Sequence, residues 1–84
     1  MAMERADVLR KVVEIISPFA KNKEALVDVS EQTHILDDLK VNSARLVDVI
    51  LEFEDAFDIE VEDEAADSVN TVGDAVDLIL ARAG

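Results

Sequence analysis

Few residues of this chain could do chemistry, and Ser43 has the most informative setting. It lies in the stretch DDLKVNSARLVDVILEFEDAF (residues 37–57), where a polar turn passes into a long helical pattern. A catalytic serine needs a base to activate it, and the single histidine, His34, lies nine residues upstream beside Ile35 and Leu36. A lone histidine in such a setting is more typical of a packing or surface residue. The chain is therefore not expected to be an enzyme.

Other common kinds of site are also missing. The chain has no cysteine, which excludes disulfides, thiolate metal sites and a cysteine nucleophile. Its two glycines, Gly73 and Gly84, cannot form a glycine-rich phosphate loop. The acidic run EVEDEAAD (residues 60–67) lacks the central glycine and the ligand spacing of an EF-hand. No dedicated metal site is predicted.

Ser43 can instead accept a group that another enzyme adds. A serine in the first turn of a helix projects outward, and the amides and dipole there stabilise an attached phosphate. The simpler alternative is an ordinary helix-start serine. The local pattern does not separate the two.

The elements that must position Ser43 are helices. Three segments carry apolar residues at helical spacing, and a short helical turn is expected at residues 63–68. No strand is predicted at 59–61, because no second strand exists to pair with it. We therefore predict an all-α bundle of three main helices and one short helix, with residues 1–84 as a single domain. The three main segments are residues 4–17, 43–57 and 70–84.

Local signals mark the ends of these helices. Pro18 disfavours helical dihedrals in the residue before it and so ends the first helix. Asn42 or Ser43 can cap the second helix. Thr71, with Asp74 three residues later, resembles a capping box at the start of the last helix.

The connection between the first and second helices, residues 19–42, is unusually long for a compact domain, and such loops are often functional. A short helical turn is expected near residues 22–26. Isolated apolar residues indicate that the connection packs onto the core. These expected anchors are Leu26, Val27, Val29, Ile35, Leu36 and Leu39.

The net charge of −12 is concentrated in the second half, since residues 41–84 hold twelve of the twenty acidic residues and two of the eight basic ones. Such a surface repels nucleic acid and anionic lipid and attracts basic protein partners. The plain alternative is a solvated face that keeps the protein soluble. With no signal peptide and no apolar run long enough to cross a bilayer, a cytoplasmic location is expected.

The ordered set ILDDLKVNSARLVDVILEFEDAFDIEVEDE…NTVGDAVDLI resembles an acyl carrier protein along nearly the whole chain. The resemblance implies that Ser43 carries 4′-phosphopantetheine, donated by coenzyme A through a magnesium-dependent phosphopantetheinyl transferase. The thiol of this arm would hold acyl groups as thioesters and deliver them to fatty-acid, lipid or related biosynthetic enzymes. Two alternatives stay open: a carrier of aminoacyl, peptidyl or polyketide intermediates, and an unmodified acidic adaptor.

The resemblance also assigns roles to two apolar lines on the second helix. The inner line would pack on the first and last helices, and the outer line would dock synthase, acyltransferase or acyl-loading enzymes that carry basic patches. The alternative for Val47 and Leu51 is burial in the core. The expected inner line is Leu46, Val49, Ile50, Phe53 and Phe57; the expected docking residues are Ala44, Arg45, Val47, Asp48, Leu51, Glu54 and Asp55.

Further expectations follow from the resemblance: an acyl cavity between the second, third and fourth helices, and a monomer. Three departures from the family pattern indicate a specialised carrier with dedicated partners. Asn42 and Ala44 flank the serine where aspartate and leucine are usual. Arg45 stands where an acidic residue is common, and Lys40 where glycine is common.

Overall fold

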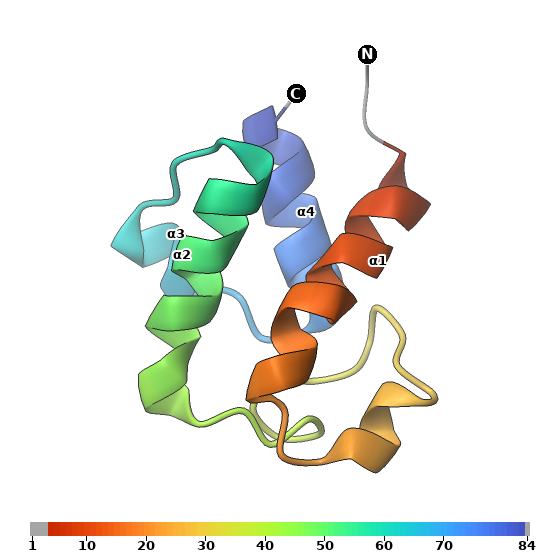
Figure 1. The fold of residues 1–84 in the computed structure, drawn as a ribbon. Coiled ribbons are helices and arrows are strands. Elements are labelled where there is room, and N and C mark those ends of the chain that lie inside the picture. The colour runs from red at the N-terminus through yellow and green to blue at the C-terminus, as the bar shows by residue number, and fades with distance from the viewer. Residues whose placement is uncertain (1–3, 84) are drawn as a thin grey trace.

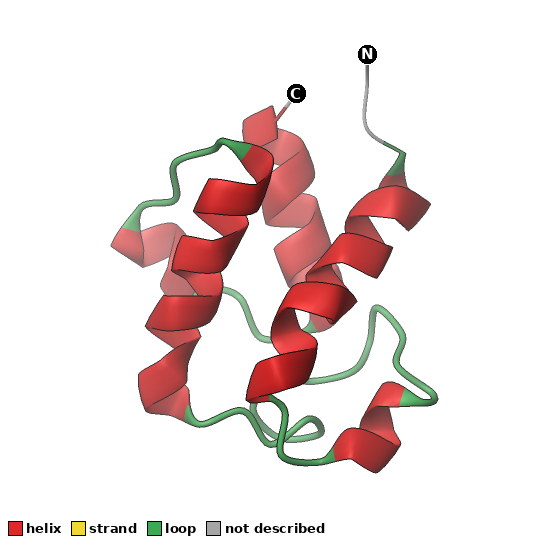
Figure 2. Ribbon diagram, viewed as in Figure 1, coloured by secondary structure: helices red, strands yellow, loops and turns green. Residues whose placement is uncertain are grey.

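The computed structural model describes residues 4–83, and its framework is three long helices: α1 (Arg5–Ile16), α2 (Leu46–Phe57) and α4 (Val72–Ala83). A short helix, α3 (Asp63–Asp67), precedes α4. Figures 1 and 2 show the long helices side by side, with no strand in the described part of the chain. The predicted all-α architecture is confirmed. Residues 1–3, at the start of the predicted domain, lie outside the described residues. So does residue 84, the last residue of the predicted domain and of the predicted last helix.

The core forms where α1 packs against α2 and α4, and α2 packs against α4. Helical spacing places apolar residues on one side of each helix, as Val8, Val12 and Ile16 show in α1. Burying a side chain of this size contributes about 1.5–3 kcal/mol before entropic costs. The predicted inner line of α2 is confirmed. Its buried members are Val49, Ile50 and Phe53, and its partly buried members are Leu46 and Phe57.

The helix ends follow the sequence signals. Pro18 lies in a 3₁₀ turn, Ser17–Phe19, which ends α1 and turns the chain into the long connection. A second 3₁₀ turn, Lys23–Leu26, forms where a helical turn was predicted. The side chain of Asn22 caps it by accepting a hydrogen bond from the amide of Ala25 over 3.4 Å.

The long connection packs onto the bundle, as predicted, but not through all of the expected residues. Ile35 and Leu39 are buried, and Leu26 and Val29 are partly buried. The prediction was wrong for Val27, which is 83% exposed, and for Leu36, which is 36% exposed. Apolar character alone does not say which residues of an aperiodic loop turn inward.

Backbone hydrogen bonds fasten this connection to the segment before α4. The amide of Ile35 donates to the carbonyl of Asn70 over 3.0 Å, and the amide of Val72 donates to Thr33 over 2.9 Å. An isolated bridge pairs Ala20 with Val41 at the other end of the loop. These bonds satisfy loop backbone groups that would be costly to bury unpaired.

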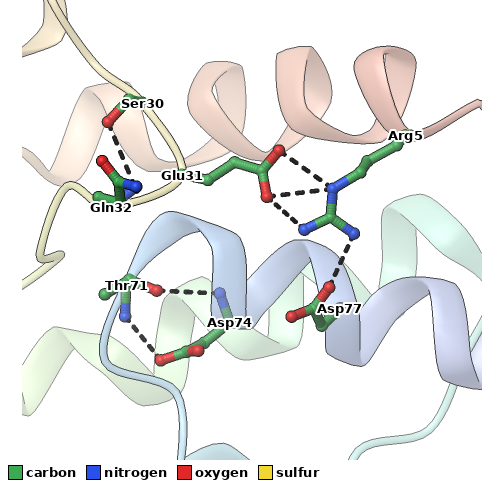
Figure 3. Close-up of polar contacts among 7 residues, drawn as sticks. All are labelled: Arg5, Ser30, Glu31, Gln32, Thr71, Asp74 and Asp77. Atoms are coloured by element: carbon green, nitrogen blue, oxygen red, sulfur yellow. Dashed lines mark hydrogen bonds and ion pairs between the residues drawn. The ribbon is translucent and has the colours of Figure 1, made fainter.

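The predicted capping box at the start of α4 is present and reciprocal (Figure 3). The amide of Asp74 donates to Oγ1 of Thr71, and the amide of Thr71 donates to Oδ2 of Asp74, each over 3.0 Å. The amides of Thr71 and Asn70, by donating to this carboxylate, hold the pKa of Asp74 below its usual value.

Arg5 joins three segments at the surface by pairing with Glu31 of the long connection and with Asp77 of α4 (Figure 3). Its Nε lies 3.0 Å from both carboxylate oxygens of Glu31, and its Nη1 lies 2.7 Å from Oδ1 of Asp77. The Arg5 side chain lowers the pKa of Glu31. All three side chains are partly exposed, so solvent screening limits what the pairs add to stability.

Candidate functional site

Ser43 lies exposed at the first position of a 3₁₀ turn, Ser43–Arg45, which leads directly into α2. Of the two predicted capping residues, Asn42 is the one that caps. Its Oδ1 accepts a hydrogen bond from the amide of Ala44 over 2.9 Å. No hydrogen bond involving the Ser43 hydroxyl is present within residues 4–83, so this group is free to react.

The amides around Ser43 are already engaged. The amide of Ala44 donates to the Asn42 side chain, and the amide of Arg45 donates to the Asn42 carbonyl over 2.8 Å. The amide of Leu46 donates to the carbonyl of Ser43. The expectation that these amides would be available to an attached phosphate is therefore not met. The helix dipole still favours a negative charge at this end of the helix.

A groove of about 170 Å³ opens beside Ser43, between α2 and α3. Its walls are mainly aliphatic and its rim is acidic. The resemblance placed a cavity between the second, third and fourth helices, but no residue of α4 lines this groove. Sequence reasoning did not single out Val61, Asp63, Ala66 and Asp67, which form its far wall. The lining comprises Ser43, Leu46, Val47, Ile50, Leu51, Glu54, Val61, Asp63, Ala66 and Asp67.

Glu54, an expected docking residue, also has a structural contact. Its Oε2 accepts a hydrogen bond from the amide of Val61 over 2.9 Å, and its carbonyl accepts one from the amide of Ile59 over 3.1 Å. These bonds hold the α2–α3 connection against the end of α2. Glu54 thereby fixes one wall of the groove.

The predicted outer line of α2 is exposed. Val47 is 65% exposed, Leu51 is 54% exposed, and Ala44 is also at the surface. The alternative that Val47 and Leu51 belong to the core is therefore wrong.

The expected polar docking residues differ in how free they are. Arg45 pairs with Asp48 over 3.1 Å, which partly neutralises both side chains. Asp55 is exposed and has no ion pair within residues 4–83. The acidic rim of the outer line is thus weaker near Ser43 than further along α2.

Within the described residues, His34 makes no hydrogen bond to Ser43. It is exposed, and its backbone amide donates to Oδ2 of Asp38 over 2.8 Å. Across residues 4–83 no cluster of three histidine, aspartate or glutamate side chains is arranged to hold a metal ion. Over the same residues, no helix has the length and apolar character needed to span a membrane.

Comparison with known proteins identifies the family. Residues 10–79 match the family model described as the phosphopantetheine attachment site. The acyl carrier protein of Prochlorococcus marinus (strain MIT 9515) is 37% identical over 82 residues, covering 98% of this chain and all of the relative. That of Lactobacillus acidophilus is 34% identical over 83 residues, again covering 98% of this chain and all of the relative.

Solved structures agree. The acyl carrier protein of Enterococcus faecalis superposes with a TM-score of 0.78 at 40% identity, covering 95% of this chain and 99% of that one. The acyl carrier protein of Thermotoga maritima gives a TM-score of 0.77 at 31% identity, covering 95% and 91%. The family match spans most of the chain, the relatives are aligned over their whole length, and the fold is shared. The chain therefore belongs to the acyl carrier protein family, and its role is that of a carrier rather than an enzyme.

Proposed function

We propose that Ser43 is the attachment residue for 4′-phosphopantetheine, donated by coenzyme A, and that residues 1–84 act as one carrier domain for acyl thioesters. The observation that supports this most directly is the position of Ser43: exposed at the start of α2 and on the edge of an aliphatic groove. When bound, the group supplies a thiol that holds the acyl chain as a thioester.

The residues around Ser43 fit this role. The side chain of Asn42 caps the turn that begins at Ser43. The bridge between Ala20 and Val41 anchors the chain just before that turn. In the attachment step the Ser43 hydroxyl loses its proton and its oxygen forms a new bond to the phosphorus that carries the pantetheine arm. The phosphoanhydride bond of coenzyme A at that phosphorus breaks, and adenosine 3′,5′-bisphosphate leaves. No side chain within residues 4–83 is hydrogen-bonded to that hydroxyl, so the modifying enzyme must supply the base.

We further propose that Val47 and Leu51 dock the partner enzymes. An exposed apolar strip with charged residues around it is typical of an interaction site. Its partners would be the phosphopantetheinyl transferase and acyl-loading, synthase or acyltransferase enzymes with basic patches facing Glu54 and Asp55. The carrier would act as a monomer in the cytoplasm. The relatives are acyl carrier proteins, which favours an acyl cargo over aminoacyl, peptidyl or polyketide cargo.

The experiment that tests the attachment is intact mass after incubation with coenzyme A, magnesium and a broad-specificity phosphopantetheinyl transferase. We expect the mass of one phosphopantetheine to be added to the native chain. Ser43→Ala should gain nothing, whereas Ser68→Ala, which removes another exposed serine hydroxyl, should load normally. Loading of Ser43→Ala, or no loading of the native chain by the transferase of its own source, would overturn the assignment.

The residues that depart from the family pattern support a specialised carrier. Asn42 keeps the capping bond but lacks the charge of the usual aspartate, and Ala44 presents less apolar surface than leucine. We expect slow turnover of the loaded protein by a general fatty-acid synthesis enzyme. If the double variant Asn42→Asp with Ala44→Leu is turned over faster, these two residues cause the slow turnover. Normal turnover of the native chain would contradict the specialisation.

A further inference from the structure

We propose that a second, positively charged groove beside Ser43 binds the phosphodiester that joins the prosthetic arm to the chain. This inference rests on the proposed attachment at Ser43. The groove, of about 590 Å³, lies between the end of α1 and the start of α2. Figure 1 shows these two ends at the same, lower end of the bundle. Pro18, Phe19, Lys21, Lys23, Asn42 and Arg45 are among the residues that line it. Ser43 does not line this groove itself but lies in the chain between Asn42 and Arg45, which do.

The charges of the two grooves around Ser43 are opposite. The groove between α2 and α3 carries three carboxylates, Glu54, Asp63 and Asp67, and no basic residue. The second groove carries three of the eight basic residues of a chain whose net charge is −12, and no acidic residue. A phosphodiester carries one negative charge, so it is repelled by the first groove and attracted by the second.

Backbone contacts fix the cationic groove next to Ser43. Ala20 pairs with Val41, and the amide of Asn22 donates to the carbonyl of Leu39 over 3.1 Å. The side-chain amide of Asn22 also donates to the carbonyl of Asp38 over 2.9 Å. These bonds place the chain around Lys21 alongside the residues that lead into Ser43.

The basic residues differ in how free they are to bind an anion. Lys21 has no ion pair within residues 4–83, so it offers an unshared positive charge. Lys23 donates to the carbonyl of Ser17 over 2.6 Å, which fixes its ammonium group on the groove. Arg45 is shared with Asp48. The binding site therefore depends most on Lys21, with Arg45 closest to Ser43 in the chain.

The three amides that follow Ser43 are not available to bind the phosphodiester. A phosphate at a helix start is often held by free amides, but the amides of Ala44, Arg45 and Leu46 are already bonded. Charge-assisted contacts from lysine and arginine are the strongest remaining interaction for a phosphate oxygen.

The test compares amide NMR spectra of the unmodified and the phosphopantetheine-loaded protein, with loading verified by intact mass. At about 20 mM salt we expect changes in chemical shift at residues 19–23 that exceed those at residues 61–67 and that shrink at about 300 mM salt. In Lys21→Gln combined with Arg45→Gln, the changes at residues 19–23 should fall by about two-fold or more.

The matched control is Arg10→Gln, which removes an exposed arginine with a similar ion pair, to Asp7, in the middle of α1, where it does not line the groove. This variant should leave the changes at residues 19–23 intact. Lys21→Gln alone provides a second variant that disturbs no hydrogen bond recorded in residues 4–83. If the mass shows no loading, the proposed attachment fails and the inference fails with it. If loading occurs but residues 19–23 do not respond, or respond equally in the double variant, the inference alone is overturned.

Discussion

The backbone amide of Gly73 donates a hydrogen bond to the carbonyl oxygen of Glu31 over 2.8 Å, which joins the long first connection to the first turn of α4. A Cβ atom at position 73 would lie 2.8 Å from that oxygen and 3.0 Å from Cβ of Glu31. Gly73 is therefore required by the close approach of another backbone, although it lies within a helix.

This contact predicts the sign of Gly73→Ala. Helix propensity alone would favour alanine by about 1 kcal/mol, but the clash with a backbone atom must displace the connection. We expect a net loss of about 1–3 kcal/mol in the free energy of unfolding, measured with urea. Ala81→Gly, at an exposed position of the same helix, should lose about 1 kcal/mol from propensity alone. A more stable Gly73→Ala protein would show that the connection moves aside without cost.

Lys40 adopts a left-handed backbone conformation, with φ of 58°. This conformation strains a residue with a Cβ and is relaxed for glycine. Lys40→Gly should therefore raise the free energy of unfolding by about 0.5–1 kcal/mol, after the entropic cost of glycine is included. Lys40→Ala removes the same charge but keeps the Cβ, so it should not stabilise the protein. Equal stabilisation by both variants would assign the effect to charge.

The Asp74 carboxylate predicts a pH-dependent contribution to stability. The amides of Thr71 and Asn70 lower the pKa of Asp74 from its ordinary value of 3.8. A group whose pKa is lower in the folded state contributes its stability above the unfolded pKa and loses it as the pH falls through the folded value. Asp74→Asn should therefore cost about 0.5–1 kcal/mol at neutral pH.

The same variant should cost less at about pH 3, which lies below the ordinary pKa of 3.8, because the contribution of a lowered pKa is lost as the pH falls further. Urea unfolding at both pH values measures the difference. Glu60→Gln is the control, since Glu60 is exposed and accepts no hydrogen bond in the described residues; it should stay within about 0.5 kcal/mol of the native protein at both. A pH-independent cost of Asp74→Asn would mean that the charge of the cap is immaterial.

The exposed strip on α2 predicts that a substitution at Val47 impairs docking of a partner enzyme but not folding. Val47→Lys removes an apolar contact and adds a positive charge that a basic partner would repel, so the kcat/KM of loading by the transferase should fall about ten-fold. Val27→Lys makes the same change at a valine that is 83% exposed in the long connection. It should load normally. Both variants should keep the melting temperature of the native protein, because both side chains are exposed.

An equal loss of loading in Val47→Lys and Val27→Lys would indicate a general effect of the added positive charge. Normal loading of Val47→Lys would remove Val47 from the docking surface for the transferase. Neither outcome would affect the assignment of Ser43, which the mass experiment tests separately.

The sequence by itself determined the local features of this protein. Residues three and four apart share one face of a helix, so the apolar period was sufficient to predict the helices and the buried side of α2. Capping is equally local, which is why the box formed by Thr71 and Asp74 was predictable. The period also placed Val47 and Leu51 on another face of the same helix, but only the structure decided that this face is exposed.

Only the tertiary structure decided the features that join distant segments. The sequence did not distinguish Ile35, which is buried, from Val27, which is not, because the long connection has no period to relate its residues. Nor did it show that Glu54 holds the amide of Val61. The two oppositely charged grooves near Ser43 also depend on the tertiary structure. Each is lined by residues that are far apart in the chain, and long-range backbone contacts determine which of them come together.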